Sequence, residues 1–235
     1  MLGTLDLLLW SLALLPMVVM ENWTQVAFQY RDDDGSEVTA TDRAAVNAND
    51  TLTIGVTYRM RIGVQGTHTG GSGSYELATP TFEYNVDAAG WNPVTTSSGN
   101  VKAVASADTT WTITDGDATT EQLAQSQTFV AGEMDENGTS TSLTLSDTEE
   151  SEWELVFQLV SPLAGGESVQ LRITENGTAL DAYTQTPSIT VASVASTLTI
   201  NVTDAITATN TPTMSLVAAA APWQPGPLMA TRISA

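Results

Sequence analysis

The sequence contains no cysteine and very few basic residues. It has seven Lys and Arg residues and 27 Asp and Glu residues, which give a formal net charge of −20. There is a single lysine, Lys102, and a single histidine, His68. Without cysteine the chain has no disulfides, thiol catalysis or cysteine-ligated zinc. The negative field repels phosphate backbones, and apart from Arg59 and Arg61 the basic residues are dispersed. Nucleic acids and anionic lipid surfaces are therefore not expected partners.

Long apolar runs are also scarce, because only residues 1–20 (MLGTLDLLLWSLALLPMVVM) are strongly apolar. A secretory signal normally carries basic residues at its start, and this segment has none. A membrane span here would have to accommodate Asp6 and Pro16, so a membrane is not the expected environment. We predict an apolar arm that anchors the protein to a partner or to its own domain through Leu7, Leu8, Leu9, Trp10, Leu14 and Leu15. Cleavage or membrane insertion of this segment is the alternative.

Apolar residues alternate with polar ones over most of the chain after Trp23. In residues 52–64 every second residue is apolar, and Arg59 and Arg61 lie on the opposite face. The same alternation occurs in residues 82–86, 111–113, 153–159 and 169–173. Such a pattern is typical of antiparallel strands with one face on the core and the other in solvent. We therefore predict one strand over residues 51–67, bent at a glycine, and further strands over the other runs.

Stretches rich in glycine, asparagine and aspartate separate these runs and predict turns. Helix is expected only as a turn or two in residues 41–48 and 119–127. The pattern predicts an all-β domain over residues 21–191, an antiparallel β-sandwich of jelly-roll-like or immunoglobulin-like type. Residues 192–235, which are rich in Thr, Ala and Pro, are expected to form an extended C-terminal arm.

Three consecutive aspartates, Asp32, Asp33 and Asp34, precede Gly35. An EF-hand loop needs ligands at alternate positions before its glycine, so the spacing here does not fit. Asp-Gly between two strand-like stretches favours a hairpin turn with solvated carboxylates. A calcium site that the triplet shares with the acidic loop at residues 133–137 is the second interpretation, and no other cofactor is expected.

Other ionisable residues are more simply explained by solvation than by catalysis. Glu152 and Glu154 alternate with Trp153 and Leu155, so we expect them on the solvent face and not as an acid–base pair. His68 lies in the glycine-rich stretch GTHTGGSG, which is expected to be a solvent loop. No catalytic residue is assigned, and the chain is not expected to be an enzyme.

The chain has six tryptophans, and aromatic rings can form binding surfaces for sugars. Trp111 and Trp153 fall in alternating runs and are expected in the core. Trp91, in the turn-rich stretch DAAGWNP, is the candidate for a ligand contact together with His68. The alternative for Trp91 is a ring folded onto the sandwich, since tryptophan is usually largely buried.

Six motifs occur in a recognisable order: FQYRDDDGSEVTAT, TYRMRIGV, FEYNVDAAGWNPV, FVAGEMDEN, EWELVFQL and RITENGTALDAYTQTPSITV. In this order residues 23–191 resemble an uncharacterised β-sandwich module of phage and prophage virion-associated or appendage proteins. The resemblance implies no catalytic residues. It implies a viral structural protein on the virion surface, foremost a capsid decoration or cement protein, which forms a homo-oligomer and binds a major capsid or appendage protein.

Two other functions remain open from the sequence. One is a tail-fibre or appendage module that binds a receptor or carbohydrate during host attachment. The other is a secreted or membrane-anchored bacterial surface protein, at the cell surface or outside the cell.

Overall fold

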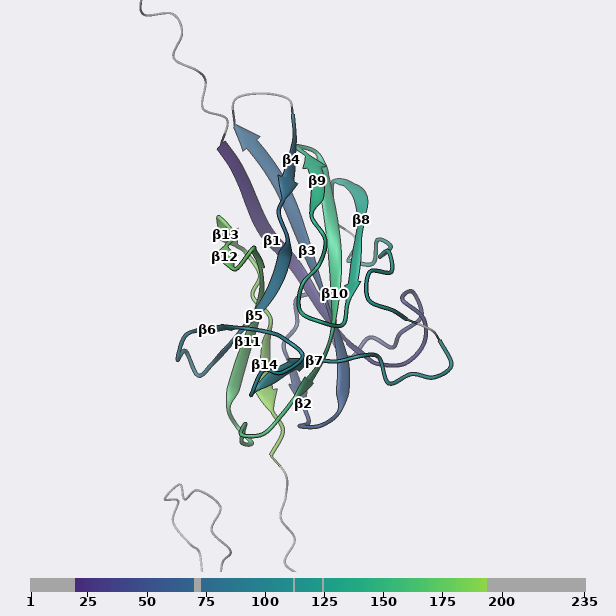
Figure 1. Ribbon diagram of the computed structural model, residues 1–235, viewed down its shortest axis with the longest axis vertical. Coiled ribbons are helices and arrows are strands. Elements are labelled where there is room, and N and C mark those ends of the chain that lie inside the picture. Colours follow the sequence, from purple (N-terminus) through teal and green to yellow (C-terminus); the bar gives the residue numbers. More distant parts are fainter. Residues whose placement is uncertain (1–19, 70–72, 112, 124, 194–235) are drawn as a thin grey trace, which may run out of the picture. The chain divides into compact units, whose positions relative to one another are not determined.

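The structure is a computed structural model that describes residues 20–69, 73–111, 113–123 and 125–193 (Figure 1). Within these residues there are strands β1 to β14 and no helix. The sheets pack against one another around a common core, so the prediction of an all-β, sandwich-like fold is confirmed. The main pairings are antiparallel, and parallel pairing occurs between β1 and β13, β10 and β8, and β14 and β2.

The first sheet, called sheet A here, is built around three long strands. Its order is β13 (Ala182–Tyr183), β1 (Met20–Asp32), β3 (Thr57–Thr69), β10 (Glu149–Leu159) and β7 (Val101–Ala103), with β8 (Thr128–Asp135) also paired to β10. Strand β3 lies in the middle and pairs with β1 on one side and β10 on the other. It therefore holds the residues that link the two halves of the sheet.

The second sheet, sheet B, faces sheet A across the core. Its order is β2 (Asp50–Leu52), β14 (Ser188–Val191), β11 (Ser168–Glu175), β5 (Pro80–Val86) and β6 (Trp91–Pro93), with β12 (Thr178–Ala179) beside β11. A separate two-stranded sheet consists of β4 (Ser74–Leu77) and β9 (Leu143–Ser146). Strands therefore run from Met20 to Val191. The predicted arms lie almost entirely outside the described residues.

The long alternating run at residues 51–67 does not form one strand. Its start, β2, pairs with β14 in sheet B, whereas β3 pairs with β1 and β10 in sheet A. Gly55, with a φ of 80°, lies in the turn between them and adopts a conformation that favours glycine. Val56, on the predicted apolar face, is 44% exposed at this crossing. The glycine bend was predicted, but the change of sheet was not.

The core lies between the facing sides of the two sheets, and alternation identified most of it. The buried residues on sheet A include Phe28, Tyr30, Met60, Ile62, Val64, Trp153, Leu155 and Phe157, and those on sheet B include Phe82, Leu171, Ile173 and Ile189. Each large apolar side chain buried in this way stabilises the fold by about 1.5–3 kcal/mol. We call this side of sheet A its inner face.

The opposite side of sheet A, its outer face, carries charged residues that are buried as well. Two segments cover it: the first covering loop, residues 33–49 between β1 and β2, and the second covering loop, residues 104–127 between β7 and β8. Glu152 and Glu154 have no exposed surface, so the prediction that they lie in solvent is wrong. The reason is tertiary, because loops distant in the sequence take the place of water.

Three local predictions also fail within the covering loops. Residues 36–41 form turns and not the second strand of a hairpin, although Arg31 and Asp42 form an isolated bridge. Neither residues 41–48 nor the described residues of 119–127 form a helix. Trp111 lies outside any strand and is 48% exposed, so its placement in the core was wrong.

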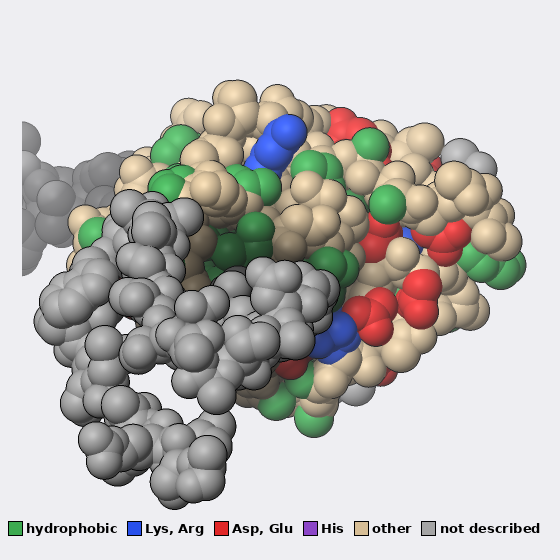
Figure 2. All heavy atoms as spheres, turned by 90° about the horizontal axis from the view of Figure 1, so that it is seen from below, with side chains coloured by type: hydrophobic (Ala, Val, Ile, Leu, Met, Phe, Trp, Pro, Cys, Tyr) green, Lys and Arg blue, Asp and Glu red, His purple; other side chains and the backbone are tan. Residues whose placement is uncertain are grey.

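The surface retains the acidity of the composition. Exposed carboxylates in the covering loops include Asp34, Asp42, Asp115, Asp117 and Glu121. Figure 2 shows acidic side chains gathered toward one side of the face that it displays, with basic side chains directly beside some of them. Among the described residues no helix is long and apolar enough to cross a membrane.

Candidate functional site

The outer face of sheet A is a buried network of ion pairs. Across neighbouring strands, Arg61 on β3 lies opposite Glu154 on β10, and its Nε donates to Glu154 Oε2 at 2.6 Å. Arg61 Nη1 lies 3.0 Å from Glu152 Oε2, and Arg31 Nη1 on β1 lies 3.0 Å from Glu154 Oε2. Alternation along three adjacent strands therefore brings these charges onto one face.

The arginines of this network hold the first covering loop through its backbone. Arg31 donates to the carbonyl groups of Glu37, Val38 and Ala40. Arg59 donates to those of Gly35 and Ser36. Five carboxylates neutralise the three buried guanidinium groups: Asp33, Glu37 and Asp42 from the first covering loop, and Glu152 and Glu154 from β10. The loop thus supplies both acceptors and counter-charges.

The glutamates hold the second covering loop in the complementary way. Glu152 accepts the backbone N–H groups of Gln122 and Leu123 at distances of 2.8–3.1 Å. Glu150 accepts from the N–H of Gln127 at 3.2 Å and from Gln65 Nε2 at 2.8 Å. Glu150 and Glu152 therefore each fix a peptide group of the second covering loop, whereas Glu154 pairs with Arg31 and Arg61.

Burial and pairing shift the pKa values in this network in opposite directions. Burial alone would lower the pKa of Arg61, but the negative charges of Glu154, Glu37 and Glu152 outweigh it and hold that pKa above its ordinary value. Burial raises the pKa of Glu152 despite the N–H groups of the loop and the charge of Arg61. Arg61 and Glu152 therefore connect the strands of sheet A to the covering loops.

A buried carboxylate outside this network closes the turn after β8. Asp135 accepts from the N–H groups of Asn137 and Gly138 and from the hydroxyl of Ser140. Burial raises its pKa to about 6, against these hydrogen bonds. Its carboxyl group therefore titrates near pH 6 in the folded chain.

The three consecutive aspartates have separate partners. Asp32 pairs with Arg43 at 2.7 Å, and Asp33 pairs with Arg59 at 2.8 Å. Asp34 accepts from the N–H and the hydroxyl of Thr41 at 2.7 and 2.8 Å. The carboxylates therefore organise the first covering loop, and Asp33 is buried rather than solvated as predicted.

The loop predicted to share calcium with the triplet does approach it. The hydroxyl of Ser106 donates to Asp33 Oδ1 at 2.8 Å, and its N–H donates to Glu136 Oε1 at 2.6 Å. Ser106 therefore links the two acidic segments by hydrogen bonds. In the described part of the chain no three acidic, histidine or cysteine side chains are grouped to hold a metal ion. Calcium binding stays a prediction.

The two predicted ligand-contact residues are both occupied by neighbouring side chains. Trp91 is half-buried, and the guanidinium of Arg172 lies 4.1 Å from the centre of its ring. The His68 side chain is fully buried at the end of β3, with its ring 3.9 Å from that of Tyr75 and 5.7 Å from that of Trp23. The solvent-loop prediction for His68 was therefore wrong. The predicted anchoring residues, Leu7 to Leu15, lie outside the described residues.

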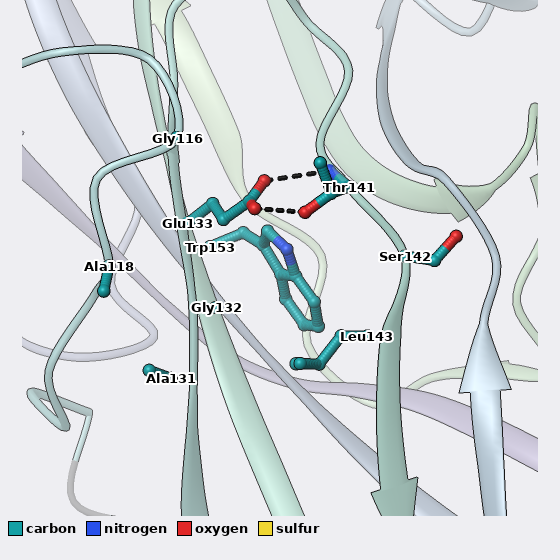
Figure 3. Close-up of a pocket in the computed structure, with 9 residues that line it drawn as sticks. All are labelled: Gly116, Ala118, Ala131, Gly132, Glu133, Thr141, Ser142, Leu143 and Trp153. Atoms are coloured by element: carbon teal, nitrogen blue, oxygen red, sulfur yellow. Dashed lines mark hydrogen bonds between the residues drawn. The ribbon is translucent and has the colours of Figure 1, made fainter.

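A pocket of about 210 Å³ lies beside β8, at a place the sequence did not indicate (Figure 3). Its walls include Gly116, Ala118, Ala131 and Gly132, its polar rim comprises Glu133, Thr141 and Ser142, and Leu143 and Trp153 also line it. These residues come from the second covering loop, β8, β9 with the segment before it, and β10. No local motif joins them, so only the fold could reveal the pocket.

An irregularity in β8 shapes one side of this pocket. The pairing of β8 with β10 shifts between Glu152 and Glu154, where Gly132 lies. A Cβ at Gly132 would come within 2.2 Å of the Glu152 carbonyl, so the close approach requires glycine. The Thr119 hydroxyl donates to that carbonyl at 2.6 Å and accepts the Gly132 N–H at 3.0 Å. The pocket is therefore built on a fixed backbone.

A second pocket, of about 320 Å³, lies next to the first because Ala118 lines both. It is lined by the exposed Trp111, by Met134 and by the carboxylate-bearing residues Glu37 and Asp117. The Glu37 carboxylate accepts the N–H of Thr120 and pairs with Arg61, which outweighs burial and lowers its pKa. Glu37 is therefore engaged within the fold, whereas Trp111 presents free aromatic surface.

No protein-family model, curated protein or solved structure matches this chain. The resemblance to a phage β-sandwich module therefore stays a prediction.

Proposed function

We propose that this protein is a non-enzymatic structural subunit displayed on the surface of a phage particle, where it decorates or cements the capsid as a homo-oligomer. The observation that supports a structural role is that the buried charged side chains contact other groups of the fold. Arg31, Arg61, Glu152 and Glu154 are tied to one another and to loop backbone groups, as a rigid scaffold requires. The phage context comes from the resemblance in motif order alone.

The positions of the chain ends support the same role. Strand β1 begins near one end of the long axis of the sandwich, and β14 ends near the other (Figure 1). Residues 1–19 and 194–235 are therefore joined to opposite ends of a compact body. A subunit of this kind can contact one neighbour through the apolar segment and another through the C-terminal segment. The acidic surface would keep particles apart in solution.

Strand addition at the sheet edges, a common means of assembly, has little support here. The strands β13, β7, β2 and β6 at the ends of the two sheet orders each contain two or three residues. The longer edge strand β8 is partly hydrogen-bonded on its other side to residues 116–119. Short edge strands offer few free backbone groups to another chain. We therefore assign the contacts between subunits to the terminal segments and not to the sandwich edges.

The test is the composition of purified particles from a lysate of the source organism. Quantitative mass spectrometry is expected to find the intact chain in many copies per particle, and native mass spectrometry of the isolated protein to find a closed oligomer. Two variants are compared, one lacking residues 2–19 and one with Glu21→Gln. The deletion should remove the chain from particles while the isolated protein still folds, and Glu21→Gln should change neither. Absence of the chain from particles, or a monomer secreted without residues 1–20, would overturn the proposal.

An appendage module that binds a receptor is the second candidate. It is favoured by the two adjoining pockets and by the exposed ring of Trp111. Particles that carry the chain on their tails in few copies would select it over capsid decoration.

A further inference from the structure

The pocket beside β8 contains a buried hydrogen-bond donor for which no described residue provides an acceptor. Trp153 has no exposed surface, and its Nε1 has no hydrogen-bond partner among the described residues. In Figure 3 the indole nitrogen lies on the side of the ring that faces Thr141. Buried polar groups are nearly always paired, so an unpaired N–H at the base of a pocket points to a ligand.

The rim of the pocket supplies the complementary acceptor. Glu133 Oε2 accepts the N–H of Thr141 at 2.8 Å, and Glu133 Oε1 contacts the Thr141 hydroxyl. A carboxylate accepts about four hydrogen bonds, so both oxygens keep free lone pairs. The hydroxyl of Ser142 points away from Glu133 and accepts the N–H of Thr79 at 3.0 Å (Figure 3). The pocket therefore offers a donor and a charged acceptor to one small ligand.

This combination selects the charge of the ligand. An anion would be repelled by Glu133 and by a chain of net charge −20. An ammonium group has no lone pair for the Trp153 N–H and would leave it unpaired. A hydroxyl group accepts from an N–H and donates to a carboxylate, so it satisfies both Trp153 and Glu133.

We infer that this pocket binds one sugar residue of a neutral glycan. The volume of about 210 Å³ is below the range of roughly 300–1,000 Å³ for drug-sized ligands, so it suits a single ring. The methyl groups of Ala118 and Ala131 offer apolar contact to the C–H groups of that ring. The inference concerns this site alone and does not rest on the particle-surface role.

The direct test is a titration of the full ¹⁵N-labelled chain with neutral methyl glycosides (gluco, galacto, manno and N-acetylglucosamine). At least one should shift the Trp153 indole N–H signal saturably, with an affinity in the millimolar range because so small a ligand makes few contacts. Glucuronic acid, the negatively charged counterpart, should leave the signal unchanged because Glu133 and the net charge of −20 repel it. No saturable shift with any neutral glycoside, or an equal shift with glucuronic acid, would overturn the inference.

Two variants test the site without altering the core. Glu133→Gln keeps the size of the side chain but loses the charged acceptor, and should weaken binding by about tenfold or more. Ala131→Val adds bulk at an exposed position and should abolish binding. Their matched controls, Glu21→Gln and Ala179→Val, change exposed residues elsewhere and should bind as the original chain does.

The neighbouring pocket provides the competing outcome. If the glycan stacks on Trp111 instead, Trp111→Ala abolishes binding and Glu133→Gln leaves it unchanged, which would overturn the assignment. The indole signal is assigned by its loss in Trp153→Phe. If that variant does not fold, the affinities of the Glu133→Gln and Ala131→Val variants decide the matter alone.

Discussion

The two faces of sheet A are equally buried but are built from opposite chemistry. On the inner face, Ile62 and Leu155 pack into the apolar core, and on the outer face Arg61 and Glu154 lie under the covering loops with no exposed surface. Apolar burial is non-directional and needs only matching shape. The outer face instead needs a partner for each charge, and the loop backbones and carboxylates provide it.

The difference between the faces lies in how each responds to the loss of one group. Removing an apolar side chain leaves a cavity that the surroundings can partly fill. Removing one partner of a buried ion pair leaves a charge with neither water nor a counter-ion. The ionic face is therefore less tolerant of single changes, even where the net contribution of its ion pairs to stability is small.

The largest effect is expected from Glu154→Ala. This change leaves both Arg31 and Arg61 without their shared carboxylate, and we expect the free energy of unfolding to fall by about 3–5 kcal/mol. Urea denaturation followed by circular dichroism measures it. Because buried charges are little screened, the loss should be nearly independent of salt. A loss below about 1 kcal/mol would mean that water reaches this face after all.

On the inner face the matched change is Leu155→Ala, one residue along the same strand. Leu155 is fully buried, so the lost packing and the residual cavity should cost about 2–5 kcal/mol. The same urea titration should show no dependence of this loss on pH between 5 and 8, since no titrating group is removed. A strong pH dependence would show that the two faces are coupled through β10.

Asp135→Asn tests a buried carboxylate by pH. The pKa of Asp135 in the folded chain is about 6, above that of an unfolded aspartate, so the folded state binds the proton more tightly. The original chain should therefore gain about 2 kcal/mol from this group as the pH falls from 7 to 4. The difference in unfolding free energy between the original and Asp135→Asn chains isolates that gain. A difference that stays constant with pH would contradict the raised pKa.

The smallest expected effect is that of Asp33→Asn, at about 1–2 kcal/mol, because the amide oxygen of Asn can still accept hydrogen bonds from Arg59 and Ser106. Asp33 pairs with Arg59 and accepts from Ser106 and Ala107, so it joins the two covering loops. Amide hydrogen exchange should increase at residues 105–108 and in the first covering loop, whereas exchange in β1, β3 and β10 should be unchanged. The exposed Asp117→Asn is the control in the second covering loop. Equal exchange in both variants would show that Asp33 does not hold the loops.

Much of the fold could be predicted from alternation. Most of the buried apolar residues of β3, β5, β10 and β11 are those that the apolar period of two places on one side, as with Met60 and Phe157. Trp111 shows the limit of the method. The alternating run that contains Trp111 is short, and Trp111 pairs with no described strand. The pairing of a segment depends on residues elsewhere in the chain.

The candidate site was less predictable than the fold. The pocket beside β8 draws Ala118, Glu133, Ser142 and Trp153 from segments that are distant in the sequence. Of these, Glu133 belonged to the acidic loop considered for calcium, and Trp153 was assigned to the core. Each assignment described the residue by itself. Their meeting in one pocket depends on the bulge at Gly132 and on the path of the second covering loop.

The sequence by itself determined the all-β class, the inner face and the acidity of this protein, because alternation and charge are local properties of the chain. Only the tertiary structure decided that the outer face is also buried. Leu123, 29 residues before Glu152, donates its N–H to that carboxylate, and Glu37, 24 residues before Arg61, pairs with the guanidinium. An alternating strand has the same sequence pattern whether its polar face meets water or the peptide groups of a distant loop. Water and loop groups can both satisfy the charged side chains, so only the tertiary structure determines which of the two they contact.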